Sequence, residues 1–424
     1  MADASPDAAS HSAAPHHPLV HLEPGRATAL VLLLASLSMV GPFTIDTFFP
    51  AFPAMQSALS ATPWQMQQTL TVYLIAYAVM ALVHGALSDA VGRRPVVLAS
   101  LVVYLLASVG CALSGSLGQL LLFRTIQGLS AGAGSIVGRA VIRDCYTGPQ
   151  AQKVMSLVHM LFGIAPALAP MVGGWLLPWG WPATFWFLVL LALLLLLLTA
   201  RVLPETHPPS QRQPLHPVAL MAGYGELLRS ARFRWLALAA GFNFSAVFIY
   251  ISSAPVVVLE HLGFSEQQFA SLFVPVIGGM VLGSFCVGRI AGRLSSAQGV
   301  RLGYLAMFVG LSWNLLQALS SDGMSWPWGV LPIGLIGLGT SIAFPLLSLL
   351  MLDLAPTRRG GNSSLQMFIS LAVISIVAGA LAPLVNHSIS ALAISSASLT
   401  GIGWLCWWRA GRYEVALPGA QSSV

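Results

Sequence analysis

Residues 183–203 read ATFWFLVLLALLLLLLTARVL, and Arg201 is the single charged side chain in this stretch. An α-helix needs about 20 consecutive apolar residues to cross the hydrocarbon core of a bilayer. The stretch therefore predicts a transmembrane helix, and stretches of the same kind occur on both sides of it.

Twelve apolar runs of spanning length follow one another along the chain. They lie near residues 28–52, 67–87, 95–115, 119–143, 152–177, 183–203, 235–259, 267–290, 298–320, 327–353, 363–385 and 389–409. The composition agrees with this count, because 56% of the 424 residues are hydrophobic and 8% are charged, whereas soluble domains carry about 25% charged residues. The sequence predicts an all-α integral membrane protein whose surface faces lipid.

One long polar stretch, residues 204–234, divides the twelve runs into six and six. It contains an amphipathic patch around Tyr224 to Leu228. We therefore expect two six-helix halves, residues 27–203 and 235–409, joined by a cytoplasmic central loop at 204–234. Gly92-Arg93 and Gly292-Arg293 occupy equivalent loops of the two halves, a trace of the internal duplication that transporter folds commonly show.

The ends of the chain are expected to be tails. Residues 1–26 are rich in Ala, Ser, Pro and His, a composition that cannot bury a core, and they predict a disordered tail. Residues 410–424 form a short tail at the other end. The histidines of the first tail could bind a metal, but irregular His tracts more often do not. They are His11, His16, His17 and His21.

The positions of the 19 basic residues predict the orientation in the membrane. With the N-terminus inside, every one except Arg124 lies in or beside a cytoplasmic segment, as the positive-inside rule requires. The basic excess is thus a topology signal and not a nucleic-acid surface. We expect a multi-pass protein of the cell inner membrane with both termini cytoplasmic. Tryptophans mark the outer rims, namely Trp64, Trp179, Trp181, Trp326 and Trp328.

Motifs for enzymatic or metal chemistry are missing from the sequence. The four cysteines lie far apart, and there is no H-E-x-x-H, Walker or G-x-S-x-G sequence. The sequence therefore predicts no enzyme, no cofactor and no metal site.

The loop after the second run reads Gly85-Ala-Leu-Ser-Asp89-Ala-Val-Gly92-Arg93-Arg94-Pro95. Its glycines allow a tight turn, and an acid with two arginines can form charge contacts that a conformational change must break. This segment resembles the signature loop of the major facilitator superfamily, and the resemblance extends from the first run to the last.

Three further motifs are similar to sequences of drug:proton antiporters. Arg124-Thr-Ile-Gln127-Gly128 resembles the R-x-x-Q-G signature of proton-coupled members. Ile45-Asp46-Thr47-Phe48-Phe49-Pro50-Ala51-Phe52-Pro53 resembles the I-D-M-Y-L-P-A-L-P stretch of the bicyclomycin and chloramphenicol resistance (Bcr/CflA) branch. In the fifth run, Ala169-Pro170-Met-Val-Gly173-Gly174 resembles the antiporter signature G-P-x-x-G-G, with Ala169 in the place of the first Gly. Gly163 and Pro166 precede it in the same run.

The resemblance implies the major facilitator fold and a gate at the cytoplasmic rim. The gate residues would be Gly85, Asp89, Gly92, Arg93 and Asp144. Asp89 would face the start of the eleventh helix, near residues 361–364, and Arg93 would pair with Asp144. Ala90 replaces a basic residue that the family usually has there. The glycines and prolines of the fifth run would allow it to pack closely against the other half.

Two charges lie inside apolar runs, Asp46 and Arg124, and charges in hydrocarbon are costly enough that those present usually function. We expect them at similar depth, with Asp46 carrying a coupling proton, Arg124 tuning it, and Gln127 belonging to the same site. A static ion pair between Asp46 and Arg124 is the alternative. His159 and His84 are weaker titratable candidates.

A substrate pocket is expected at the midplane between the halves. Aromatic and amide groups suit a drug-like molecule, and the candidates are Phe43, Tyr73, Tyr77, Asn243, Phe244, Phe248, Phe273 and Gln366. The sequence thus favours a monomeric, proton-coupled exporter of small organic compounds. A metabolite exporter or importer, and a non-transporting sensor, stay open as alternatives.

Overall fold

The computed structural model describes residues 24–146, 148–212, 214–290, 293–319, 324–354 and 359–413. Nearly all of the first predicted tail, Gly292, Arg358 and residues 414–424 lie outside these ranges. His159 lies in a described helix, but its side chain is outside the described part. The described residues are almost entirely helical and contain no strand.

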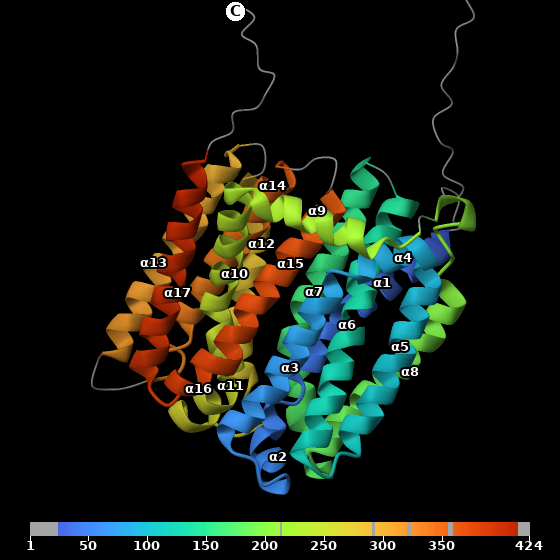
Figure 1. The fold of residues 1–424 in the computed structure, drawn as a ribbon. Coiled ribbons are helices and arrows are strands. Elements are labelled where there is room, and N and C mark those ends of the chain that lie inside the picture. The colour runs from blue at the N-terminus through green and yellow to red at the C-terminus, as the bar shows by residue number, and fades with distance from the viewer. Residues whose placement is uncertain are drawn as a thin grey trace, which may run out of the picture.

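The first six predicted runs form one set of helices (Figure 1). This set comprises α1 (Pro24–Asp46), η1 (Phe49–Ala51), α2 (Phe52–Ala58), α3 (Pro63–Ala81), α4 (His84–Val91), α5 (Arg93–Ala112), α6 (Leu117–Cys145), α7 (Gly148–Leu176), η2 (Leu177–Trp179) and α8 (Pro182–Val202).

The last six runs form the second set, and two short elements lie between the sets. The connecting elements are η3 (Pro209–Gln211) and α9 (Pro217–Arg229). The second set comprises α10 (Ala231–Ser252), α11 (Ala254–Val256), η4 (Val257–His261), α12 (Ala270–Ile290), α13 (Ser296–Ala318), α14 (Leu331–Leu352), α15 (Arg359–Ile376), η6 (Val377–Leu381), α16 (Ala382–Val385) and α17 (Ile389–Gly411).

Within the described ranges, eleven helices are long and apolar enough to span a membrane, and twelve spans result if the bent pair α3 and α4 counts as one. The predicted membrane fold class is confirmed. Four runs are interrupted rather than continuous. The first breaks after Asp46, ahead of Pro50 and Pro53, because proline lacks the N–H that would continue a helix. The second bends by 47° between α3 and α4. The seventh passes from α10 through α11 and the π-helical turn η4, and the eleventh passes through the π-helical turn η6.

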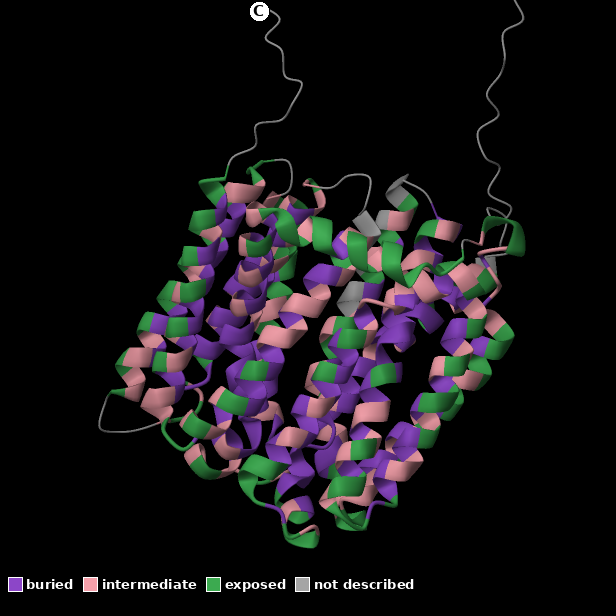
Figure 2. Ribbon diagram, viewed as in Figure 1, coloured by how far each residue is buried: buried purple, intermediate pink, exposed green. Residues whose placement is uncertain are grey.

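Apolar side chains cover the outside of the assembly. On α8, Leu190 is 66% exposed and Leu194 and Leu197 are at least half exposed. Buried residues gather in the interior of the assembly (Figure 2). This pattern is typical of a lipid-facing surface, because lipid tails are as apolar as leucine and its exposure to them costs no free energy.

The faces of the molecule differ in charge. We call the face where α4, α9 and the C-terminal ends of α6 and α17 lie the basic face (top of Figure 1). It carries Arg93, Arg143, Arg229 and Arg409. The opposite face carries α2, η2, α11 and α16.

The two helix sets meet mainly along α3 with α15 and along α7 with α12. Near the opposite face the contact is polar as well as apolar. Gln67 Nε2 donates to the Ser252 carbonyl at 3.1 Å, and Gln68 Nε2 donates to the Gly379 carbonyl at 3.0 Å. The Phe49 and Phe273 rings lie 6.5 Å apart across the same junction. These contacts close the opposite face.

Candidate functional site

Arg124 is the most deeply buried charge of the described residues, with an exposed fraction of 0%. Its Nε donates to the Thr69 carbonyl at 3.2 Å, and its Nη1 donates to the Thr44 carbonyl at 3.1 Å. The guanidinium carbon lies 4.4 Å from the ring centroid of Phe48 and 4.6 Å from that of Tyr73. Carbonyl dipoles and aromatic faces therefore surround this cation in place of an acid.

Asp46 is the last residue of α1 and is 3% exposed. Its Oδ1 has no hydrogen-bond partner, and neither does Nη2 of Arg124, among the described residues. The two side chains form no ion pair there, so the alternative of a static ion pair is wrong. Arg124 nevertheless lies near this end of α1 in space, because it donates to the carbonyl of Thr44, two residues before Asp46.

Gln127 connects Arg124 to α5. Its Oε1 accepts hydrogen bonds from Arg124 Nη1 at 3.0 Å and from Cys111 Sγ at 3.5 Å, and its Nε2 donates to Ser108 Oγ at 2.8 Å. The Q of the R-x-x-Q-G motif is thus fully engaged in orienting the arginine. The structure joins α1, α3, α5 and α6 around one buried cation.

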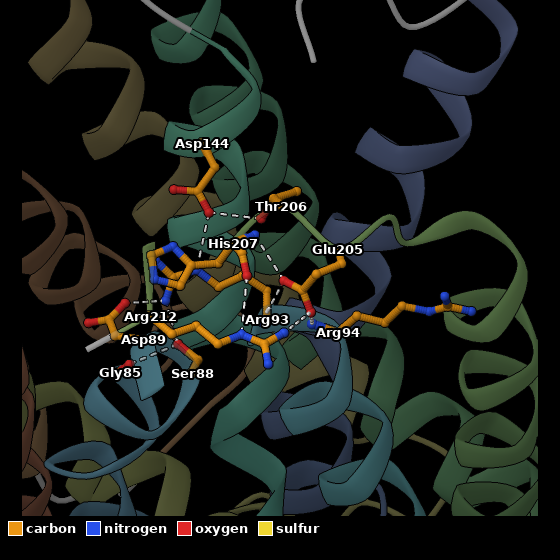
Figure 3. Close-up of polar contacts among 10 residues, drawn as sticks. All are labelled: Gly85, Ser88, Asp89, Arg93, Arg94, Asp144, Glu205, Thr206, His207 and Arg212. Atoms are coloured by element: carbon orange, nitrogen blue, oxygen red, sulfur yellow. Dashed lines mark hydrogen bonds and ion pairs between the residues drawn. The ribbon is translucent and has the colours of Figure 1, made fainter. Parts of the chain in front are cut away.

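The predicted gate residues lie together at the basic face (Figure 3). Arg93 is mostly buried; it pairs with Asp89, and its Nε lies 3.1 Å from Asp144 Oδ2. Its Nη1 also donates to Ser88 Oγ at 2.7 Å. The predicted Arg93–Asp144 pair is present.

Two residues that sequence reasoning missed complete this cluster. Thr206 Oγ1 donates to Asp144 Oδ2 at 2.8 Å, the oxygen that Arg93 also contacts. Glu205 accepts from the backbone N–H groups of Arg93 at 3.0 Å and of Arg94 at 3.3 Å. A sequence signal existed, because Glu205 is an acid placed directly after an apolar run at the rim where basic residues gather.

Gly92 explains how Glu205 comes so close. Its φ is +113°, and a Cβ at this position would meet the Glu205 carboxylate and the Arg212 guanidinium. No side chain caps α5 from its own N-cap position. The first N–H groups of a helix have no partner within the helix, so the carboxylate of Glu205 serves as their cap from a distant segment.

The whole cluster lies within one helix set and its first connecting residues, between Gly85 and Arg212. Gly85 approaches the other set, since a Cβ there would lie 4.0 Å from Ser364 Oγ on α15. Asp89 is half exposed and engaged with Arg93. Its expected contact with the start of α15 stays a prediction.

The fifth-run motif lies on α7, which contains Pro166 and Pro170. The expected close packing against the other half occurs at Gly174, where a Cβ would meet the Glu266 backbone. Gly173 instead faces the Thr47 backbone of its own half, and a Cβ at Gly163 would meet nothing within 4 Å. Of the three motif glycines, Gly174 makes the close approach to the other half.

The predicted pocket residues have different surroundings. Tyr73 packs on Arg124 and on Tyr77, whose hydroxyl lies 3.1 Å from Ser135 Oγ. The ring centroids of Phe43 and Phe187 lie 5.7 Å apart.

In the second half, Phe244 contacts Phe248 and Phe344. Asn243 is fully buried against Met307, and Gln366 donates to Ser348. Phe273 belongs to the junction at the opposite face. The role of all eight residues in substrate binding stays a prediction.

Histidine and metal chemistry receive little support. His84 begins α4 and is buried, with no partner for Nδ1 among the described residues. Over the same residues, no group of three or more His, Cys, Asp or Glu side chains could hold a metal ion.

A family comparison matches residues 32–380 to the Major Facilitator Superfamily. The chain belongs to this superfamily. Its members are membrane transporters, so this protein is a multi-pass transporter and not an enzyme.

Curated relatives narrow the branch. An uncharacterized MFS-type transporter, YdgK of Bacillus subtilis, is 36% identical over 66% of this chain and 71% of its own. A chloramphenicol resistance protein of Pseudomonas aeruginosa is 30% identical over 74% of each chain. A bicyclomycin resistance protein homolog of Haemophilus influenzae is 29% identical over 71% of this chain and 75% of its own. These relatives support the drug:proton antiporter branch that the motifs indicated.

Solved structures agree on the fold. A bacterial homolog of the human lysosomal transporter Spinster, in an inward-facing and unoccupied conformation, superposes with a TM-score of 0.68 at 17% identity. The alignment covers 92% of this chain and 98% of the other. At this identity the likeness concerns the fold alone.

Proposed function

We propose that this superfamily member is a proton-coupled exporter of small organic compounds that works as a monomer by alternating access. Its basic face, and with it both termini, would lie in the cytoplasm of an inner-membrane protein. The placement of the basic residues supports this orientation, and the resistance proteins among its relatives support export of a drug-like compound.

The observation that supports the proposal is that two buried charges, Asp46 at the end of α1 and Arg124 on α6, form no ion pair with each other. Asp46 would carry the proton. Arg124 would respond because one of its acceptors, the Thr44 carbonyl, moves whenever the end of α1 moves. Protonation of Asp46 changes the charge beside this end of α1, and a shift of the helix would then rearrange the hydrogen bonds of Arg124.

Transport in proteoliposomes tests the proposal, with chloramphenicol as the probe and an imposed pH gradient as the driving force. We expect gradient-driven chloramphenicol transport that a protonophore abolishes. Asp46→Asn should lose the pH dependence, whereas Asp353→Asn, an exposed acid directly after α14, should keep it. Chloramphenicol transport that does not depend on pH in the unmodified protein would refute proton coupling. A normal pH dependence in Asp46→Asn would refute the role of Asp46.

The orientation has its own test. A reporter that is active only in the cytoplasm, fused after Val424, should be active in whole cells. Activity only of a reporter that requires the periplasm would reverse the proposed sidedness.

A further inference from the structure

Helix α9 crosses the basic face between the two helix sets (Figure 1). Most of it is accessible, as Val218 is 83% exposed and Met221 is 56% exposed. Tyr224 is different, because it is 4% exposed. It is the buried side chain of α9, and it packs between other helices.

The Tyr224 hydroxyl contacts the first helix set at a break. It donates a hydrogen bond to the Leu82 carbonyl at 2.7 Å. Leu82 follows the last residue of α3, where the chain bends by 47° into α4. A bend interrupts the regular helical hydrogen bonds and leaves backbone groups that need other partners. Tyr224 supplies a donor at that point.

The same side chain contacts the second set at the start of α15. A Cβ at Gly361 would lie 3.6 Å from Tyr224 Cε1. Burial raises the pKa of Tyr224, and a hydrogen bond with the Ser364 hydroxyl lowers it in part. Tyr224 therefore lies between the α3–α4 bend and the first turns of α15, which belong to opposite halves.

The ion pairs of the gate cluster do not connect the two halves. They join Arg93 to Asp89 and Asp144, all in the first half. What the cluster does is hold the beginning of the connecting segment, since Glu205 and Thr206 bind it. The segment is thus fixed to the first half at one end and reaches across both halves at Tyr224.

We propose that Tyr224 is a positioning residue of the gate at the basic face, where it ties the bend between α3 and α4 to the start of α15. This inference rests on the proposed alternating access, in which the halves separate at this face. Separation then requires that Tyr224 leave either Leu82 or α15. The contacts of Tyr224 with Leu82 and with α15 therefore stabilise the closed state of the basic face.

Removing the hydroxyl should shift that equilibrium without removing the ring. The net contribution of one buried hydrogen bond corresponds to about a three- to tenfold change in an equilibrium constant. We therefore expect Tyr224→Phe to raise the ratio of open to closed basic face by about three- to tenfold.

Distances between two spin labels, measured by pulsed electron resonance in lipid nanodiscs, test this directly. One label would replace Val91 at the end of α4, and the other Leu294 after α12, both of which are exposed. The four native cysteines would be replaced in this background. We expect Tyr224→Phe to increase the population with a long distance between the labels. The control Tyr413→Phe, which removes an exposed hydroxyl at the same face, should leave this population unchanged.

An unchanged distance distribution in Tyr224→Phe would overturn the proposal, as would an equal shift in Tyr413→Phe. Ser364→Ala is a second variant, and it should also shift the distance distribution toward long distances. A shift toward short distances, which is the closed state, would overturn the proposal. Because the measurement needs neither substrate nor proton gradient, its failure is distinct from a failure of the proposed export, which the chloramphenicol assay decides.

Discussion

The clearest prediction concerns Glu205→Gln, which keeps the shape of the side chain but removes its charge. Glu205 Oε1 accepts from the N–H groups of Arg93 and His207, at 3.0 and 2.9 Å. Oε2 accepts from the N–H of Arg94 at 3.3 Å and lies 4.0 Å from Arg212 Nη2. A glutamine can present its oxygen at one of these two positions only.

The size of the effect follows from these contacts. If the amide oxygen stays with Arg93 and His207, the amide NH₂ faces the N–H of Arg94, and one charge-assisted bond is lost. Such bonds contribute about 1.5 to 3 kcal/mol, and the neutral bonds that persist weaken as well. Because Glu205 is partly solvent-accessible, we discount this to about 1 to 2 kcal/mol. That corresponds to about a 5- to 30-fold change in a local opening equilibrium.

Hydrogen exchange measured by mass spectrometry provides the assay. Arg94 is the second residue of α5, and its N–H has no carbonyl partner within the helix, so its protection depends on Glu205. We expect the peptide that contains Arg93 and Arg94 to exchange about 5- to 30-fold faster in Glu205→Gln. Glu260→Gln, which changes an exposed acid near the opposite face, is the control. Unchanged exchange in Glu205→Gln, or equal acceleration in both variants, would refute the capping role.

Three further substitutions test the remaining parts of the site. Arg124→Lys keeps the charge but loses the planar fork that reaches several acceptors at once, so transport should fall at least about tenfold with unchanged protein yield; wild-type rates would contradict this. Gly174→Val should abolish transport because its side chain would strike the backbone before α12, whereas Gly401→Val, with open space around it, should be active; equal activity of the two would argue against a tight crossing. Gly92→Ala should lower the thermal stability of the purified protein, since φ is +113° and the Glu205 carboxylate occupies the space, while Gly118→Ala should not; an unchanged melting temperature in Gly92→Ala would contradict the need for glycine.

The contacts between the two halves differ at the two faces. At the opposite face the side-chain amides of Gln67 and Gln68 donate to carbonyls of the second half, and Gly174 lies directly against the Glu266 backbone. At the basic face the gate ion pairs stay within one half, and Tyr224 reaches the other. In the proposed alternating access, opening of the basic face would therefore disturb the contacts around α9 more than the ion pairs of the gate cluster.

The sequence alone predicted the membrane class, the division into six and six spanning runs, and two charges inside those runs, Asp46 and Arg124, both of which are buried in the structure. These features depend on local hydrophobicity, and a charge within an apolar run stands out without any knowledge of packing. The motifs also predicted the Arg93–Asp144 pair, because the family places these residues at adjacent helix ends.

Only the tertiary structure decided how these residues are partnered. Carbonyl groups and aromatic rings, and not Asp46, stabilise the charge of Arg124, and this depends on how α1, α3 and α6 approach one another. The partners of Glu205 and Tyr224 lie 112 and 142 positions away in the chain. Hydropathy and spacing carry no information about such contacts, because they arise when helices that are distant in sequence pack side by side and their unpaired backbone groups take whichever polar side chain lies within reach.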